Sequence, residues 1–156
     1  MEQNFTLKKL TLETLGVSCQ YGIQTTKDDD SVETAIYQKK DSRPPHLDLI
    51  HLFERGLASV IATVFHFDKI DGFALNQIVP TTIKFSGKNE NVGIVISGYF
   101  ISGVGRLQFK TSKIKYKAGQ SEFCAKLTVL VHDIEAEIQK YLFGNKVATV
   151  EEFGND

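Results

Sequence analysis

A run of positively charged side chains without acidic neighbours is the feature of this sequence that most directly indicates a chemistry. Its members share one predicted strand and are Arg106, Lys110, Lys113, Lys115 and Lys117. No Asp or Glu occurs between Asn91 and Gln120. Cations crowded in this way repel each other unless water or an anion neutralises them, and a phosphate backbone is the natural match. The run by itself favours a solvated edge strand that lysines protect from pairing, and the functional alternative is a phosphate or nucleic-acid contact.

The alternation of a strand complicates this prediction, because successive side chains point to opposite faces. Arg106 and Lys110 share one face, and the three lysines that follow fall in the opposite phase. A single basic face therefore requires a bulge near Thr111 and Ser112. The overall charge gives no support for a nucleic-acid binder, since such proteins are often clearly basic and this chain has a formal net charge of -1.

Aromatic side chains accompany the basic run. They lie on or beside the same predicted sheet and are Tyr99, Phe100, Phe109 and Tyr116. Bases stack on exposed aromatic rings in proteins that bind single strands, so we predict that Tyr99 or Tyr116 stacks on bases. As a group, however, these rings favour the hydrophobic core over exposure.

No pattern in the sequence predicts catalysis, a cofactor or a metal centre. The acidic run over 28–33 lacks the ligand spacing and the glycine of a calcium loop, and it favours a solvated turn. His46 and His51 are five residues apart, whereas a helical metal pair needs a spacing of four. No serine stands in a GxSxG elbow, and no P-loop lysine is present. We expect a protein that is not an enzyme and has no cofactor or metal.

The remaining composition predicts an ordinary soluble domain. Cys19 and Cys124 each lie in an apolar stretch, which predicts buried and inert thiols. The first residues lack the apolar segment of a signal peptide. The most apolar stretches, 56–67 and 92–104, are shorter than the roughly 18 residues that a membrane span needs. We expect a cytoplasmic protein without membrane contact.

The elements that must position the basic run form two similar series. The first is predicted as strands over 4–13, 17–24 and 32–40 and a helix from about Pro45 to about Phe67. The second is predicted as strands over 78–85, 92–101 and 106–117 and a helix with Ser121 as its N-cap. We predict that residues 1–142 form a single domain and that 143–156 form a short, acidic and poorly anchored tail.

These series predict an α+β fold of order βββα-βββα. Its strands alternate apolar and polar residues and its turns are short, which favours an antiparallel sheet. We predict about six strands with two amphipathic helices on one face. The strand–helix–strand alternation of a doubly wound sheet is absent from the sequence pattern.

Three segments resemble small uncharacterised proteins encoded by phages and mobile elements. They are the helix start Pro44–Leu49, the hairpin Val95–Gln108 and the helix end Glu135–Phe143. The resemblance spans most of the chain, and it implies a bacterial cytoplasm and a role in phage replication, recombination or counter-defence. The repeated order of strands and helix also resembles the architecture of Whirly and Pur-type single-strand binders, which commonly use four strands per unit.

Two functional hypotheses result. The first is a non-enzymatic protein that contacts single-stranded DNA or RNA through the basic strand, with the five cations on phosphates and Tyr99 or Tyr116 on bases. The resemblance implies that a phage encodes it. The second is a homo-oligomeric interaction or counter-defence protein that binds a partner protein or sequesters an anionic nucleotide ligand.

Overall fold

The computed structural model describes residues 2–117, 119 and 121–148. Its strands are β1 (Glu2–Leu12), β2 (Val17–Thr26), β3 (Val32–Asp41), β4 (Ile78–Ser86), β5 (Gly93–Ser102), β6 (Gly105–Lys110) and β7 (Ile114–Lys115). Its longer helices are α1 (Leu47–His51), the π-helical turn η1 (Leu52–Leu57), α2 (Ala58–Val64) and α3 (Glu122–Gly144). Short 3₁₀ turns occur at η2 (Phe67–Lys69), η3 (Leu75–Gln77) and η4 (Asn89–Asn91). The predicted α+β class with an antiparallel sheet is confirmed, and the sheet has seven strands.

The sheet consists of two halves that meet at a short seam. Its strand order is β3-β2-β1-β4-β5-β6, and β7 continues the β6 edge by pairing with β5. β1 pairs with β2 along its whole length, and β4 pairs with β5 in the same way. By contrast, β1 pairs with β4 only where Lys9–Thr11 lies opposite Thr82–Lys84. This β1–β4 seam joins the half formed by β1–β3 to the half formed by β4–β7.

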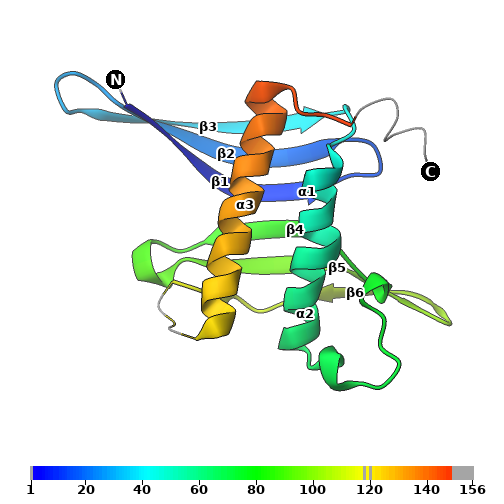
Figure 1. The fold of residues 1–156 in the computed structure, drawn as a ribbon. Helices are drawn as coiled ribbons and strands as arrows, with labels where there is room; N and C mark the ends of the chain where they lie inside the picture. Colours follow the sequence, from blue (N-terminus) through cyan, green and yellow to red (C-terminus); the bar gives the residue numbers. More distant parts are fainter. Residues whose placement is uncertain (1, 118, 120, 149–156) are drawn as a thin grey trace.

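Both helical segments lie over the same face of the sheet. In Figure 1, α1–α2 and α3 run side by side in front of the strands and cross them. The two segments approach closely at Gly56, where an added Cβ would lie 2.5 Å from Leu130 Cδ1. Glycine allows this approach without any shift, whereas a larger residue would require the end of the Leu130 side chain to move. We call the covered side the helix face and the other side, over which no described helix lies, the open face.

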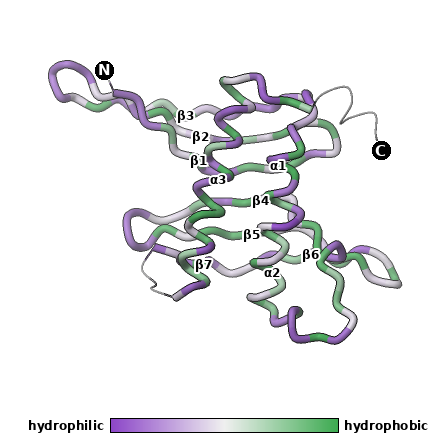
Figure 2. The backbone as a smooth tube through the Cα atoms, viewed as in Figure 1, coloured by the Kyte–Doolittle hydropathy of each residue, from purple (hydrophilic) through white to green (hydrophobic). Residues whose placement is uncertain are grey.

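Alternation in the strands sends apolar side chains to the helix face. In β2, Val17, Cys19 and Tyr21 are buried, while Ser18 and Gln20 between them are not. Figure 2 shows the matching pattern of hydrophobic colour through the sheet and hydrophilic colour at the β2–β3 turn. Cys19 is buried as predicted, and burial raises the pKa of its thiol to about 11. Cys124 is only partly buried, so its predicted burial is not met.

The first helix is shorter than predicted and contains an irregular turn. It begins at Leu47, and His46 Nδ1 accepts a hydrogen bond from Asp48 N at 3.1 Å. Its middle is the π-helical turn η1, and α2 ends at Val64. The chain cannot continue as a helix beyond this end because His66 has a left-handed backbone with φ of 60°. None of the described helices has the length and apolar character needed to cross a membrane.

The start of the predicted tail is anchored. α3 extends to Gly144, and beyond it Ala148 N donates to Pro44 O at 2.9 Å. Lys146 Nζ pairs with Asp48 Oδ2 at 2.7 Å and with Glu137 Oε2 at 3.0 Å. The expectation of a poorly anchored segment is therefore wrong up to Ala148, because these bonds hold it to α1 and α3. Residues 149–156 lie outside the described residues.

A polar cluster fastens the end of β3 to α3. Arg43 donates from Nε to Asp41 Oδ1 at 3.0 Å and from Nη2 to Asp41 Oδ2 at 2.8 Å. Its guanidinium also lies 5.2 Å from the centroid of the Tyr141 ring, and the Tyr141 hydroxyl donates to Arg43 O at 2.7 Å. The Arg43 hydrogen bonds hold the pKa of Asp41 at about 2. This cluster is structural, because its partners satisfy one another.

Candidate nucleic-acid interface

Four of the five predicted cations share the open face. Arg106 pairs with Ile101 and Lys110 pairs with Ser97, at positions of β5 that alternate with the buried Ile94 and Ile96. These two cations therefore face the open side, because directly paired residues point the same way. Whether the lysines after Lys110 also lie on the open face depends on whether the alternation of the strand continues unchanged.

An interruption after Lys110 shifts the phase of the chain. Thr111 N donates to Ile96 O at 2.9 Å, and Thr111 Oγ1 accepts from Ile96 N at 3.0 Å, so a side chain replaces a backbone carbonyl of the ladder. β7 then places Ile114 opposite the buried Ile94 on the helix face. Lys113 and Lys115, on either side of Ile114, consequently face the open side. The irregularity lies where the sequence required a bulge.

Lys117 and Tyr116 do not join this group. Tyr116 is only 4% exposed, and burial raises the pKa of its hydroxyl. It belongs to the core, so its proposed stacking on bases is wrong. Lys117 lies near Glu135 of α3, where its charge opposes the rise in the Glu135 pKa that burial causes. Lys117 therefore has an acidic neighbour on the helix side.

Tyr99 lies on the open face with one side of its ring covered. It pairs with Gln108, and the Arg106 guanidinium lies 4.4 Å from the centroid of its ring. This is a cation–π contact between two of the predicted site residues. Because Arg106 occupies one side of the ring, a base can stack either on the other side or on the outer plane of the guanidinium.

Four further lysines on the open face were missed by sequence reasoning. They are Lys8, Lys9, Lys40 and Lys84. Lys9 lies directly opposite Lys84 across the β1–β4 seam. The register shift between Leu7 and Lys9 makes Lys8 a bulge residue, and its side chain lies over Gly22 on the same face. Adjacent lysines in a regular strand would point to opposite faces, so the sequence alone gives no signal for this cluster.

Together these residues form one set, which we call the open-face cations: Lys8, Lys9, Lys40, Lys84, Arg106, Lys110, Lys113 and Lys115. None of them forms an ion pair with a described residue, although lysines elsewhere do, such as Lys126 with Glu122 and Lys140 with Glu137. Register places Glu2 on this face at the far end of β1, and Glu13 accepts from Ser18 Oγ at 2.7 Å. Positive charge therefore predominates on the described part of the open face.

Hydroxyl side chains fill the centre of the open face. A row of directly paired residues crosses all six main strands and consists of Lys40, Ser18, Thr11, Thr82, Ser97 and Lys110. The Thr11 and Thr82 hydroxyls lie 3.0 Å apart across the seam. Over β1–β3, a groove of about 420 Å³ is lined by Lys9, Lys40, one carboxylate, Glu13, and uncharged polar side chains between them. Such hydroxyl and ammonium groups are donors that suit phosphate and sugar oxygens.

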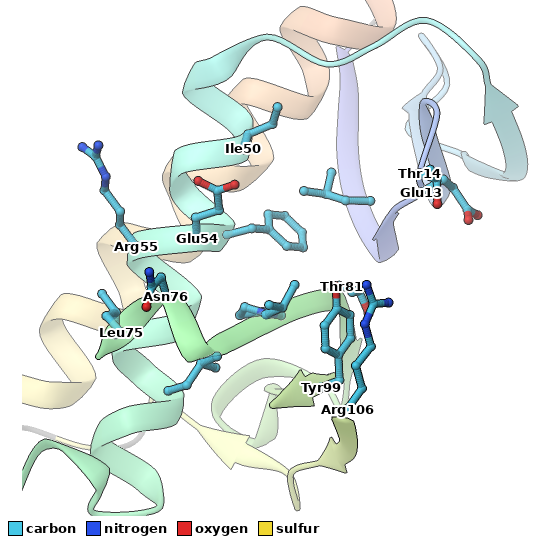
Figure 3. Close-up of a pocket in the computed structure, with 15 residues that line it drawn as sticks. Glu13, Thr14, Ile50, Glu54, Arg55, Leu75, Asn76, Thr81, Tyr99 and Arg106 are labelled. Carbon is cyan, nitrogen blue, oxygen red and sulfur yellow. The ribbon is translucent and has the colours of Figure 1, made fainter. Parts of the chain in front are cut away.

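A second hollow opens where β1 and β4 separate beyond the seam. This pocket of about 620 Å³ has Glu13 and Thr14 on one wall and residues of α1 and η1, including Phe53 and Glu54, on another. Figure 3 shows Glu54 on the helix side and the stacked Tyr99 and Arg106 across from it. The lining combines apolar walls with two carboxylates, Glu13 and Glu54, and with the Arg106 guanidinium. This suits a flat heterocycle whose amino groups meet the carboxylates and whose anionic group meets Arg106.

Within the described residues, no group of three or more His, Cys, Asp or Glu side chains is placed to hold a metal ion. Comparisons with protein-family models, with curated proteins and with solved structures each found no match to this chain.

Proposed function

We propose that this protein binds single-stranded nucleic acid across the open face of its sheet, without catalysing a reaction. The observation that carries the proposal is the Lys9–Lys84 pair. Directly opposite side chains have Cβ atoms about 4.5–5.5 Å apart, and like charges there destabilise a sheet. The described residues supply no carboxylate to this pair, so a polyanion is the ligand that relieves the repulsion.

The form of the surface favours a single strand. The path from β3 to β6 is roughly 24 Å wide at about 4.8 Å per strand, and the open-face cations lie at both edges and at its centre. A sheet face of this kind accepts an extended backbone, whereas reading a duplex needs an element that enters a groove. The resemblance to phage and mobile-element proteins favours a role in replication, recombination or counter-defence.

Electrostatic contacts are expected to dominate this binding. Tyr99 with Arg106 offers one stacking position, so phosphates supply most of the affinity. In the single-strand case each neutralised phosphate contributes about -0.7 to the slope of log affinity against log salt concentration. Five contacts would give a slope of about -3.5.

The test is fluorescence anisotropy of a labelled single-stranded oligonucleotide between about 50 and 200 mM salt. A steep negative slope with similar affinity for different sequences supports the proposal. Absence of binding at the lowest salt, or an affinity that does not change with salt, would contradict it. A duplex of the same sequence serves as the comparison and should bind more weakly.

A second candidate function is capture of a free nucleotide, which the pocket beside Arg106 favours. Its phosphate would contact Arg106 at the mouth, and its base would lie against the apolar wall that includes Phe53. Isothermal titration with nucleoside mono- and triphosphates tests this candidate. Arg106→Ala should abolish nucleotide binding, whereas Lys40→Ala at the opposite edge should leave it unchanged.

A further inference from the structure

The strand β3 forms a long and exposed edge of the sheet. It pairs with β2 over its full length, and its other side meets no described strand. Val32, Ile36 and Tyr37 on it are 55%, 55% and 47% exposed. A long edge strand with exposed apolar residues is a template for pairing with another strand. The opposite edge is different, because β6 is only six residues long and the chain is interrupted after Lys110.

Symmetry limits how this edge can pair with a second copy. Two identical strands that extend one sheet are related by a two-fold axis perpendicular to it. Directly opposite residues must then share a face, so the register must be centred on a residue rather than between two residues. For β3, the candidate centres near the middle of the strand are Ala35, Ile36 and Tyr37.

Only one of these centres gives charge complementarity along the strand. Centred on Ile36, the register places Glu33 opposite Lys39 of the second copy, and by symmetry Lys39 opposite Glu33. It also places Ala35 opposite Tyr37, a small residue against a large one, and Ile36 opposite Ile36. Opposite charges and apolar contacts in direct pairs stabilise a sheet.

The neighbouring registers lose these pairs. Centred on Tyr37, Glu33 would lie opposite Asp41, which places two carboxylates together. Centred on Ala35, Lys39 and Lys40 would pass the end of the partner strand, which begins at Val32. The existing Glu33–Lys27 ion pair, at 3.2 Å, is exposed on both sides and therefore exchanges readily for a new partner.

We propose that the protein forms a two-fold dimer by antiparallel pairing of β3 with β3 of a second copy, in the register centred on Ile36. Two sheets of seven strands become one continuous sheet of fourteen. The perpendicular axis leaves both open faces on the same side. This proposal is independent of what the open face binds.

Charge reversal tests the register. Light scattering and analytical ultracentrifugation of the full chain should show a dimer. Glu33→Lys and Lys39→Glu each place like charges opposite each other twice, and each should raise the dissociation constant about tenfold or more. The double reversal restores opposite charges and should restore the dimer. Circular dichroism checks that each variant is folded. Lys40→Glu is the control for charge reversal, because position 40 lies opposite the uncharged Val32 in this register and the dissociation constant should not change.

Cysteine cross-linking tests the same register independently. In a chain with Cys124→Ser, Ile36→Cys brings two thiols into a direct pair, within reach of a disulfide. The control Thr34→Cys separates its thiols by about 13 Å along the strand. A wild-type monomer at every concentration would overturn the proposal. A dimer that neither single reversal weakens, or that Thr34→Cys cross-links as well as Ile36→Cys, would also overturn it.

Discussion

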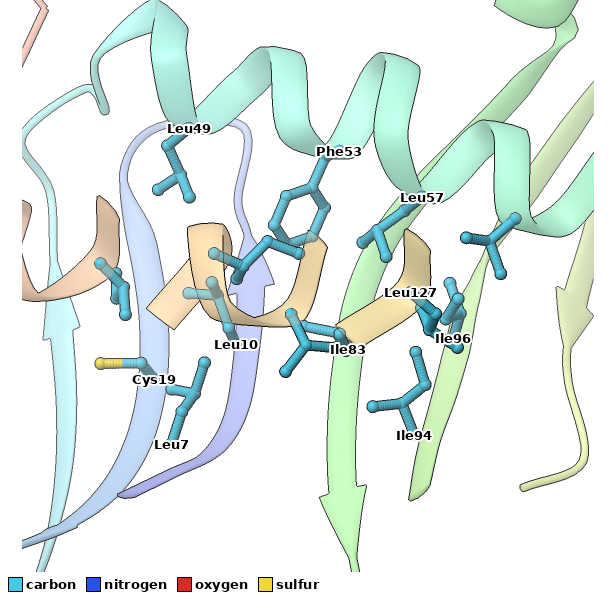
Figure 4. Packing of buried hydrophobic residues seen from close by; sticks show 14 of the residues in the cluster. Leu7, Leu10, Cys19, Leu49, Phe53, Leu57, Ile83, Ile94, Ile96 and Leu127 are labelled. Atoms are coloured by element: carbon cyan, nitrogen blue, oxygen red, sulfur yellow. The ribbon is translucent and has the colours of Figure 1, made fainter. Parts of the chain in front are cut away.

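Neighbouring residues of β5 experience very different surroundings. Ile94 and Ile96 face the helices and have no exposed surface, whereas Val95 and Ser97 face the open side and remain partly exposed. Figure 4 shows the helix face, where Ile94 and Ile96 lie with Leu10 and Ile83 beneath Phe53 and Leu57. The open face of the same strands carries lysines and hydroxyls.

The two faces therefore have different roles: the helix face stabilises the fold, and the open face is the proposed binding surface. The helix face supplies the apolar burial that folds the chain, at about 25 cal/mol per Å². None of the open-face cations forms an ion pair with a described residue, although Arg106 stacks on the Tyr99 ring, and the directly paired Lys9 and Lys84 contribute repulsion rather than cohesion. Their presence is therefore explained better by a ligand than by folding, and the two faces should respond differently to substitution.

The largest effect is expected from removing core volume. Ile96→Ala should lower the free energy of unfolding by about 2–5 kcal/mol, because it leaves a cavity under the helices. Val95→Ala, one residue away on the open face, should cost clearly less. Urea denaturation measures both. Equal losses for the two variants would show that the faces are not distinct.

A smaller effect is expected from Asp41, a carboxylate that Arg43 holds beside α3. Because the folded pKa of Asp41, at about 2, lies below its unfolded value of 3.8, its contribution is complete above about pH 4 and is lost as the pH falls toward 2. Asp41→Asn should lower the free energy of unfolding by about 1–2 kcal/mol at pH 7 and have little effect near pH 2. Urea denaturation along a pH series checks this.

Removing the lysine pair at the seam should lower the affinity for nucleic acid without lowering the free energy of unfolding. The Lys9→Ala and Lys84→Ala double variant should weaken binding of a single-stranded oligonucleotide about tenfold and reduce the salt slope by about 1.4. Its free energy of unfolding should stay equal or rise by a few tenths of a kcal/mol, because repulsion is removed. Fluorescence anisotropy measures the binding, and urea denaturation measures the free energy of unfolding. The double variant Lys126→Ala and Lys140→Ala on α3 is the matched control and should leave binding unchanged.

The smallest effect is expected at the hydroxyl row. Thr82→Ala removes the contact with Thr11 across the seam, on a partly exposed surface. The free energy of unfolding should change by no more than about 0.5 kcal/mol. A thermal melt that shows a loss as large as that of Ile96→Ala would mean that the open face carries part of the core stability.

Local patterns predicted the elements but not the order of the strands in the sheet. The alternation over 17–24 is sufficient to identify β2, because Val17, Cys19 and Tyr21 are buried and Ile23 is partly buried on the same face. The run over 106–117 was predicted as one strand and is divided at Thr111, whose side chain takes over a backbone hydrogen bond. Its cations were predicted from composition, and four of them share a face only because of that division.

The cluster at the seam could not be predicted. Lys8 and Lys9 share a face through a bulge, and Lys84 joins them through a pairing between strands that are distant in the sequence. The sequence left Tyr116 open between the core and base stacking, because a single aromatic in a basic strand fits either face, and its burial decides for the core. Register and bulges depend on tertiary packing, which cannot be predicted from local sequence patterns.

The seam also has a consequence for motion. It is the shortest run of backbone hydrogen bonds between the main strands, and it coincides with the place where Lys9 repels Lys84. Local opening of the sheet is expected to start there. A polyanion laid across these two lysines would oppose that opening. Amide hydrogens of Leu10 and Ile83 would then exchange more slowly with solvent deuterium. The bound ligand would hold the two halves of the sheet together.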